Sequence, residues 1–114
     1  MDRIAGVVLG SVPLAVALSL RMGVPFIMIR KESKAHGTGR QIEGSLLQGD
    51  RVMVVEDVIT SAGSAAFAVE TIRRAGGIVD EVAAVIDRQA GGEGRLANLH
   101  VRLVSLLKAE DLLE

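Results

Sequence analysis

Short apolar runs recur along this chain, and glycine, hydroxyl or charged residues follow each of them. The runs cover residues 4–9, 25–29, 51–55, 79–86 and 101–104. Two of the stretches between them, 13–22 and 64–75, have apolar residues at helical spacing. Strands that alternate with helices form parallel sheets, so this pattern predicts an α/β fold.

Glycine and proline set the bounds of the predicted helices. Pro13 lies in the first turn of one helix and Gly23 follows its end, while Gly76 and Gly77 stop the other. The remaining expected elements are a loop over 30–40, a short edge strand over 41–46, a loop at 91–92 and a final helix over 108–114. With 114 residues and no linker, the chain is expected to form one domain over 1–114.

Composition excludes several classes of function. Hydrophobic residues make up 49% of the chain, which indicates a folded domain, and the 2% of aromatic residues provide no platform for stacking nucleic-acid bases. A net charge of -1 gives no field that attracts nucleic acid or acidic lipid. The lack of cysteine excludes disulfides and thiolate metal sites and fits a reducing cytoplasm. No apolar run reaches the about 18 residues of a membrane span, and the first residues do not resemble a signal peptide. We therefore expect a cytoplasmic protein without nucleic-acid or membrane partners.

The predicted sheet gathers four polar clusters at one edge. Parallel strands deliver the residues that follow them to the same edge, which is where open α/β sheets bind ligands. The clusters are 10–12, 30–36, 56–64 and 87–88.

The third of these clusters combines two adjacent carboxylates, Glu56 and Asp57, with a turn that leads into a helix. The turn consists of Thr60, Ser61, Ala62, Gly63 and Ser64. Backbone amides, hydroxyls and the positive end of a helix suit a phosphate, whereas carboxylates suit sugar hydroxyls or hydrated Mg²⁺. A phosphorylated ribose presents both kinds of group. A structural explanation also stays open, in which the carboxylates end a strand and Ser64 caps the helix. The segment is neither a Walker A loop nor a G-x-G-x-x-G motif.

This segment resembles the signature with which type I phosphoribosyltransferases bind 5-phosphoribosyl-1-pyrophosphate (PRPP): an apolar strand, two acidic residues, two apolar residues and a Thr/Ser/Gly turn. The resemblance implies that Glu56 and Asp57 bind the ribose 2′- and 3′-hydroxyls, and that residues 60–64 hold the 5-phosphate. Ala62 departs from the family, which usually has Gly there. Its Cβ is expected to restrict the backbone and crowd the phosphate, with Gly63 beside it as compensation.

Residues 30–40 contain five Arg, Lys or His side chains and one acid. Mobile cations suit a pyrophosphate leaving group, and a glycine-bearing loop can close over a site and reopen. A solvated surface loop, or one that binds polyanions without specificity, is the alternative.

The same segment resembles the catalytic loop of orotate phosphoribosyltransferases, Arg-Lys-Glu-x-Lys-x-His/Tyr-Gly. The resemblance implies that Arg30, Lys31, Lys34 and His36 contact pyrophosphate, and that Lys34 contributes most to the rate. It also implies a homodimer in which this loop reaches the active site of the partner subunit.

Two further clusters fit the same family. Gly10, Ser11 and Val12 resemble its pyrophosphate loop, whose backbone amides face the diphosphate. Arg88 follows a strand, where a guanidinium can form a bidentate pair with a planar carboxylate such as that of orotate. In the family this Arg acts together with the Thr that matches Thr60. A salt bridge of Arg88 to Asp87 or a neighbour is the alternative.

The resemblance implies a three-layer α/β/α domain with a mainly parallel sheet in the order 3-2-1-4-5-6, the short third strand being antiparallel. It also implies Mg²⁺ as cofactor, with no certain protein ligand, and Lys34 and Asp57 as catalytic candidates. Family members carry an N-terminal hood over the base, whereas this chain begins at the first core strand. We therefore expect the PRPP half of the site to be complete and the base half incomplete.

The function implied is transfer of the phosphoribosyl group from PRPP to orotate, giving orotidine 5′-phosphate and pyrophosphate in pyrimidine synthesis. Three alternatives stay open: a phosphoribosyltransferase for another base, a truncated or regulatory PRPP-binding module without turnover, and a generic flavodoxin-like binding domain.

Overall fold

The computed structural model describes residues 1–31 and 41–112 of the chain. The strands are β1 (Arg3–Val7), β2 (Phe26–Ile29), β3 (Ile42–Glu43), β4 (Val52–Ile59), β5 (Glu81–Asp87) and β6 (Arg102–Lys108). The helices are α1 (Val12–Met22), α2 (Gly63–Arg74), α3 (Gly92–Ala97) and α4 (Ala109–Leu112).

The described strands form one six-stranded sheet in the order β3-β2-β1-β4-β5-β6. All neighbours pair in parallel except β2 and β3, which are antiparallel. Both the order and the single antiparallel strand confirm the prediction. β1 and β4 lie side by side in the centre, so the chain leaves the sheet in opposite directions from these two strands. This is the switch point at which α/β sheets bind ligands.

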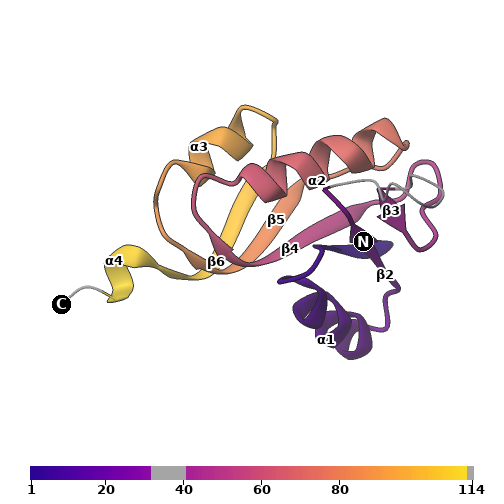
Figure 1. The fold of residues 1–114 in the computed structure, drawn as a ribbon, viewed down its shortest axis with the longest axis horizontal. Helices are drawn as coiled ribbons and strands as arrows, with labels where there is room; N and C mark the ends of the chain where they lie inside the picture. The colour runs from indigo at the N-terminus through magenta and orange to yellow at the C-terminus, as the bar shows by residue number, and fades with distance from the viewer. Residues whose placement is uncertain (32–40, 113–114) are drawn as a thin grey trace.

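Helices cover both faces of the sheet, which confirms the three-layer architecture. Figure 1 shows α1 below the sheet and α2 and α3 above it. Neighbouring residues of a strand point to opposite faces, so Ile4 packs with α1 while Ala5 packs with α2. The same alternation separates Val55 from Val54 on β4. Both faces of the central strands are therefore buried, as their nearly continuous apolar sequence predicts.

Several elements differ from the prediction. β4 continues through the acidic pair to Ile59, because its last residues pair with the end of β5. β6 runs to Lys108 instead of ending at 104, and α4 begins after it. The helix α3 was not predicted: only a loop at 91–92 was expected there, and two of the six helix residues are glycine. β1, in contrast, ends at Val7 rather than 9.

A close backbone approach holds α1 against β1. A Cβ on Gly6 would lie 2.9 Å from the Ser11 carbonyl oxygen and 3.0 Å from the Ala15 Cβ. Only glycine leaves room for the first turn of α1 at this distance, since real Cβ atoms do not approach a backbone oxygen so closely. Gly6 thereby fixes where Ser11 lies relative to the sheet.

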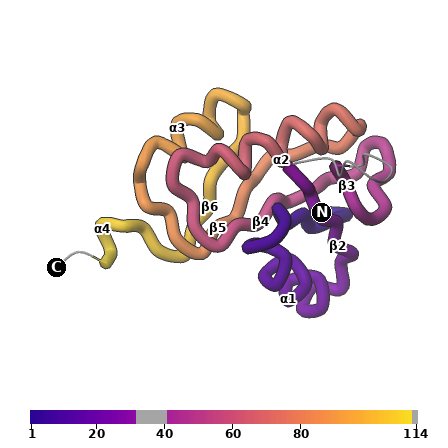
Figure 2. Tube along the Cα trace, viewed as in Figure 1, coloured from indigo at the N-terminus to yellow at the C-terminus, as the bar shows by residue number. Residues whose placement is uncertain are grey.

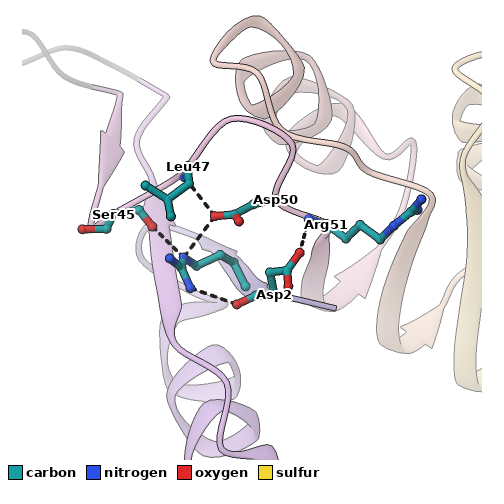
Figure 3. A network of polar contacts seen from close by, with 6 residues as sticks. Asp2, Ser45, Leu47, Asp50 and Arg51 are labelled. Carbon is teal, nitrogen blue, oxygen red and sulfur yellow. Dashed lines mark hydrogen bonds and ion pairs between the residues drawn. The ribbon is translucent and has the colours of Figure 1, made fainter.

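A polar network ties the amino-terminal ends of the two central strands to the loop that precedes β4 (Figure 3). Arg3 donates from Nε to the Ser45 carbonyl at 2.8 Å, and its Nε lies 3.4 Å from Asp50 Oδ2. Asp2 accepts the Arg51 N–H at 2.9 Å. These contacts lie at the edge opposite to the carboxyl ends of the strands, so they brace the sheet without occupying the ligand edge.

The chain path in Figure 2 shows α4 extending from the end of β6, away from the rest of the fold. Within residues 1–31 and 41–112, no helix has the length and apolar character needed to cross a membrane.

The close contact at Gly6 makes a stability prediction. Gly6→Ala is expected to lower the free energy of unfolding by about 1–3 kcal/mol, because the new methyl overlaps a backbone oxygen that cannot move freely. Gly94→Ala is the matched control, since a Cβ there meets nothing within 4 Å. In helix α3 it should raise stability by up to about 1 kcal/mol. Urea unfolding of both variants checks this, and equal effects would contradict the account.

Candidate active site

β1 ends before β4 does, and the space beyond its end forms a depression at the carboxyl edge of the sheet. Val7 is the last residue of β1, and the chain then turns through residues 8–11 into α1. The depression has a volume of about 280 Å³. Its walls are Val7, Val8, Gly10, Ser11, Lys31, Glu56, Asp57, Val58 and Ser64. Three of the four clusters predicted from the sequence thus meet here.

A buried hydrogen bond joins the turn after β1 to the acidic pair on β4. The Ser11 hydroxyl donates to Glu56 Oε2 at 2.8 Å. Ser11 is 2% exposed and Glu56 6% exposed. The second carboxylate oxygen, Glu56 Oε1, is buried and has no hydrogen-bond partner among residues 1–31 and 41–112. A buried acceptor without a donor is costly in a folded protein, so this oxygen is available to a hydroxyl or a cation of a ligand.

Burial raises the pKa of the Glu56 carboxyl above its usual value of 4.5, and the neighbouring charge of Asp57 raises it further. The hydrogen bond from Ser11 and the charge of Lys31 act in the opposite direction without cancelling the effect of burial. Glu56 is therefore harder to ionise here than in water, and a cation or a hydroxyl donor at Oε1 would favour the ionised form.

Asp57 is the exposed partner of this pair. Its Oδ1 accepts the N–H of Val58 at 2.8 Å, and its Oδ2 lies 3.7 Å from the position that a Cβ on Gly10 would take. The Glu56 carboxylate is therefore buried in the wall of the depression, and the Asp57 carboxylate lies near the turn at Gly10. The sequence placed both after the strand, whereas they lie within β4, beyond the point where β1 stops.

Two backbone N–H groups in the turn after β1 already donate to nearby backbone carbonyls. The Ser11 N–H donates to the Val7 carbonyl at 3.3 Å, and the Val12 N–H to the Leu9 carbonyl at 3.2 Å. The peptide between Val8 and Leu9 is cis. That the amides of Gly10, Ser11 and Val12 face a diphosphate stays a prediction; of the three, the Gly10 N–H makes no backbone hydrogen bond within the described residues.

The turn between β4 and α2 leaves a helix N-terminus open. α2 begins at Gly63 and no side chain caps it, so the structural explanation in which Ser64 is the cap is wrong. The first amides of α2 lack partners within the helix, as they do in every helix, and they carry its positive dipole end. Ser64 reaches the depression, whereas Thr60 and Ser61 are exposed on the turn. An anion is the natural partner of such an end.

Ala62 adopts the left-handed conformation for which the family uses glycine, with φ of 66°. Its methyl is 3% exposed and packs in the core with Ile59 and Leu96. The Cβ therefore points into the core and does not line the depression. The positive φ agrees with the expected restriction of the backbone, whereas crowding of a phosphate stays a prediction.

α3 brings a cation that the sequence analysis did not single out. A Cβ on Gly92 would lie 2.5 Å from Ile59 Cγ2 and 2.8 Å from the Thr60 carbonyl, so this glycine lets α3 pack directly on the phosphate turn. One helical turn later, Arg95 Nη1 lies 3.7 Å from the position of a Cβ on Gly63. Gly92, which was predicted as part of a loop, was the available signal, because it marks this close approach.

Register places Thr60 and Arg88 together. Ile59 pairs with Asp87, and the Arg88 N–H donates to the Ile59 carbonyl at 2.9 Å. Asp87 is 1% exposed and accepts the N–H of Gln89, and Arg88 forms no ion pair among the described residues. The Arg88 side chain is exposed at the ligand edge. The alternative in which it pairs with Asp87 is therefore not what the structure shows.

The basic segment is described only in part. Lys31 lines the depression. Arg30 instead donates from Nε to Glu43 at 2.7 Å, across β2 and β3, and this contact raises the pKa of Arg30. Lys34 and His36 lie outside the described residues.

A larger cavity lies elsewhere, between β3 and the end of α2, with a volume of about 420 Å³. Its walls are Gln41, Ile42, Gly44, Leu46, Thr71, Arg74 and Ala75. It contains no carboxylate and no helix N-terminus, so size does not make it the better candidate for the site.

The phosphoribosyl transferase domain model matches residues 1–102. This chain therefore belongs to the phosphoribosyl transferase domain family. The named relatives belong to a narrower class than the domain family. An orotate phosphoribosyltransferase of Methanocella arvoryzae is 45% identical over 111 residues, which are 97% of this chain and 63% of that protein.

Two solved structures give the same comparison. The crystal structure of orotate phosphoribosyltransferase from Aeropyrum pernix has a TM-score of 0.87 and 38% identity, over 96% of this chain and 61% of that one. The Mycobacterium tuberculosis H37Rv orotate phosphoribosyltransferase in complex with PRPP has a TM-score of 0.80 and 35% identity, over 97% of this chain and 64% of that one. This chain thus spans less than two thirds of the length of these relatives.

The raised pKa of Glu56 makes a stability prediction. The folded state favours protonated Glu56, so ionising this group lowers the free energy of unfolding. The loss develops as the pH rises from the usual carboxyl pKa through the raised pKa of Glu56 in the folded state. Glu56→Gln should therefore be more stable than the wild type at pH 7–8, and this advantage should shrink toward zero below about pH 4.

Denaturant midpoints across pH, without Mg²⁺ or ligand, check this. Glu70→Gln removes an exposed carboxylate of α2 and reports the effect of net charge alone. A stability difference between Glu56→Gln and the wild type that stays constant with pH would contradict the raised pKa of Glu56.

Proposed function

We propose that this chain carries out phosphoribosyl transfer from PRPP to orotate, giving orotidine 5′-phosphate and pyrophosphate. The observation that carries the proposal is the depression in which a turn, a lysine and two carboxylates meet, with the Ser11 hydroxyl 2.8 Å from Glu56. The relatives with known names support the same reaction.

Each part of PRPP has a matching group at the carboxyl edge. The 5-phosphate binds the open N-terminus of α2 and the hydroxyls of residues 60–64, with Arg95 as an additional cation. Glu56 and Asp57 accept hydrogen bonds from the ribose hydroxyls, which a phosphate could not replace because like charges repel. The pyrophosphate lies over the turn of residues 8–12.

Mg²⁺ is the proposed cofactor, and the donor set fits it. Mg²⁺ binds in proteins through one or two carboxylates, waters and substrate phosphates. The described residues contain no group of three metal-ligating side chains, while Asp57 is exposed and Glu56 Oε1 has no partner. When bound, Mg²⁺ would neutralise charge that develops on the diphosphate.

The cations of residues 30–36 are proposed to stabilise the leaving group. The bond between the ribose C1 and a diphosphate oxygen breaks and its electron pair goes to pyrophosphate. The base nitrogen bonds to C1 as its N–H bond breaks, and the proton passes to the departing pyrophosphate. Lys31 lies at the depression, and Lys34 and His36 are proposed to join it. Arg30 is proposed to act there once it leaves Glu43. Electrostatic stabilisation of this kind often provides the largest part of a rate enhancement.

Orotate is proposed to bind at Arg88 and Thr60, which the strand register places side by side. The guanidinium pairs with the orotate carboxylate, and a purine base has no such group. We also propose a homodimer in the cytoplasm, in which residues 30–40 act at the partner's site.

A binding module without turnover is the second candidate, because the chain spans only 63% of the Methanocella arvoryzae relative.

Turnover is tested by following orotate absorbance with PRPP and Mg²⁺. The account predicts orotate consumption that requires Mg²⁺ and that falls by about 100-fold or more in Lys34→Ala. PRPP binding measured by calorimetry without orotate consumption would support the binding module instead. Neither binding nor turnover would reject the proposed function.

Arg88→Gln tests the base specificity. It should weaken orotate binding by about 10- to 100-fold, because a charge-assisted pair is lost, and should leave PRPP affinity within about twofold. Arg21→Gln, an exposed change in the last turn of α1, is the control. Calorimetry with each ligand measures both, and an equal loss of PRPP affinity would show that Arg88 does not select the base.

A further inference from the structure

We infer that the Ser11 side chain is a positioning residue for the ribose part of the ligand: by holding one oxygen of Glu56 it reserves the other for a ribose hydroxyl. The inference rests on the proposed function and deepens it. In the sequence pattern Ser11 belongs to the pyrophosphate turn, where its side chain has no assigned role.

The hydroxyl of Ser11 is directed at the Glu56 carboxylate on β4. Ser11 is 2% exposed, and its Oγ lies 2.8 Å from Glu56 Oε2. The residues are 45 positions apart in the chain, so the bond joins two separate parts of the site. A hydroxyl buried this deeply contributes through its hydrogen bond, because no solvent competes for it.

The bond leaves the Glu56 carboxylate in one defined orientation. With Oε2 occupied, Oε1 is a buried acceptor without a partner in the part of the chain that the structure describes. An unsatisfied acceptor in a ligand depression is an unfavourable arrangement in the free protein that a ligand hydroxyl relieves. Without Ser11 the carboxylate is free to rotate, and both oxygens then require partners from water or from the ligand.

The placement of Ser11 has its own structural cause. Gly6 lets the first turn of α1 approach β1, since a Cβ there would lie 2.9 Å from the Ser11 carbonyl. The early end of β1 then brings Ser11 opposite the part of β4 that carries Glu56. The backbone geometry therefore determines that the turn of residues 8–12 lies against the Glu56 carboxylate.

The test compares PRPP, which contains a ribose, with inorganic pyrophosphate, which does not. Ser11→Ala is expected to raise the dissociation constant for PRPP by about tenfold, the loss of one hydrogen bond to a charged group. The dissociation constant for inorganic pyrophosphate, which has no hydroxyls for Glu56, should change less than about twofold. Ser11→Cys, a variant of similar volume with a weak donor, should show the same split and guards against a failure of the alanine variant to fold.

A double-mutant cycle separates positioning from general damage. In a Glu56→Ala background Ser11→Ala should have no further effect on PRPP affinity, because the carboxylate that Ser11 positions is absent. Ser19→Ala removes another hydroxyl bond of α1, the one to the Val24 carbonyl, and serves as a control with both affinities unchanged.

The outcomes distinguish this inference from the proposed function. A wild type that binds neither ligand rejects the proposed function. A wild type that binds both, with a Ser11→Ala variant that loses affinity for both equally or for neither, overturns the role of Ser11 alone.

Discussion

Ser11 and Glu56 meet because β1 ends at Val7 while the neighbouring β4 continues to Ile59. The unequal lengths of two adjacent parallel strands open a space at the carboxyl edge, and the turn into α1 fills one side of it. Gly6 is required for this arrangement, since any side chain there would displace the turn. The depression, the buried hydrogen bond and the position of the acidic pair all follow from this local geometry.

Both the backbone and the side chains contribute positive charge at the site. Helix ends and turn amides provide partial positive charge without a titratable group, while Lys31 adds full charge at the depression and Arg95 adds it beside Gly63 at the start of α2. The carboxylates lie between these positive regions, where they suit hydroxyls and a hydrated cation rather than phosphate. Burial keeps Glu56 difficult to ionise in the free protein, so ligand binding and the charge state of this residue are coupled.

Much of this could be predicted from the sequence, and the exceptions have physical causes. The apolar runs and the glycines locate the strands and α1, and the 53–65 segment locates the phosphate turn. The pairing of Ser11 with Glu56 could not be predicted, because a hydrogen bond between distant positions depends on strand lengths that sequence patterns do not fix. α3 was missed because glycine weakens its helical signal, although Gly92 is what allows Arg95 to approach the turn. A restricted backbone at Ala62 was expected, while its left-handed conformation and its packing with Ile59 and Leu96 were not predicted.

The central claim is that PRPP occupies the depression beside Glu56 and the open end of α2. Amide NMR of the chain with PRPP and Mg²⁺ tests it most directly, because each residue reports separately. The account predicts that the largest shifts fall on residues 8–12, 56–57 and 60–64, with little change around Gln41, Leu46 and Arg74 at the larger cavity. Shifts centred on that cavity, or no shifts at saturating PRPP, would contradict it.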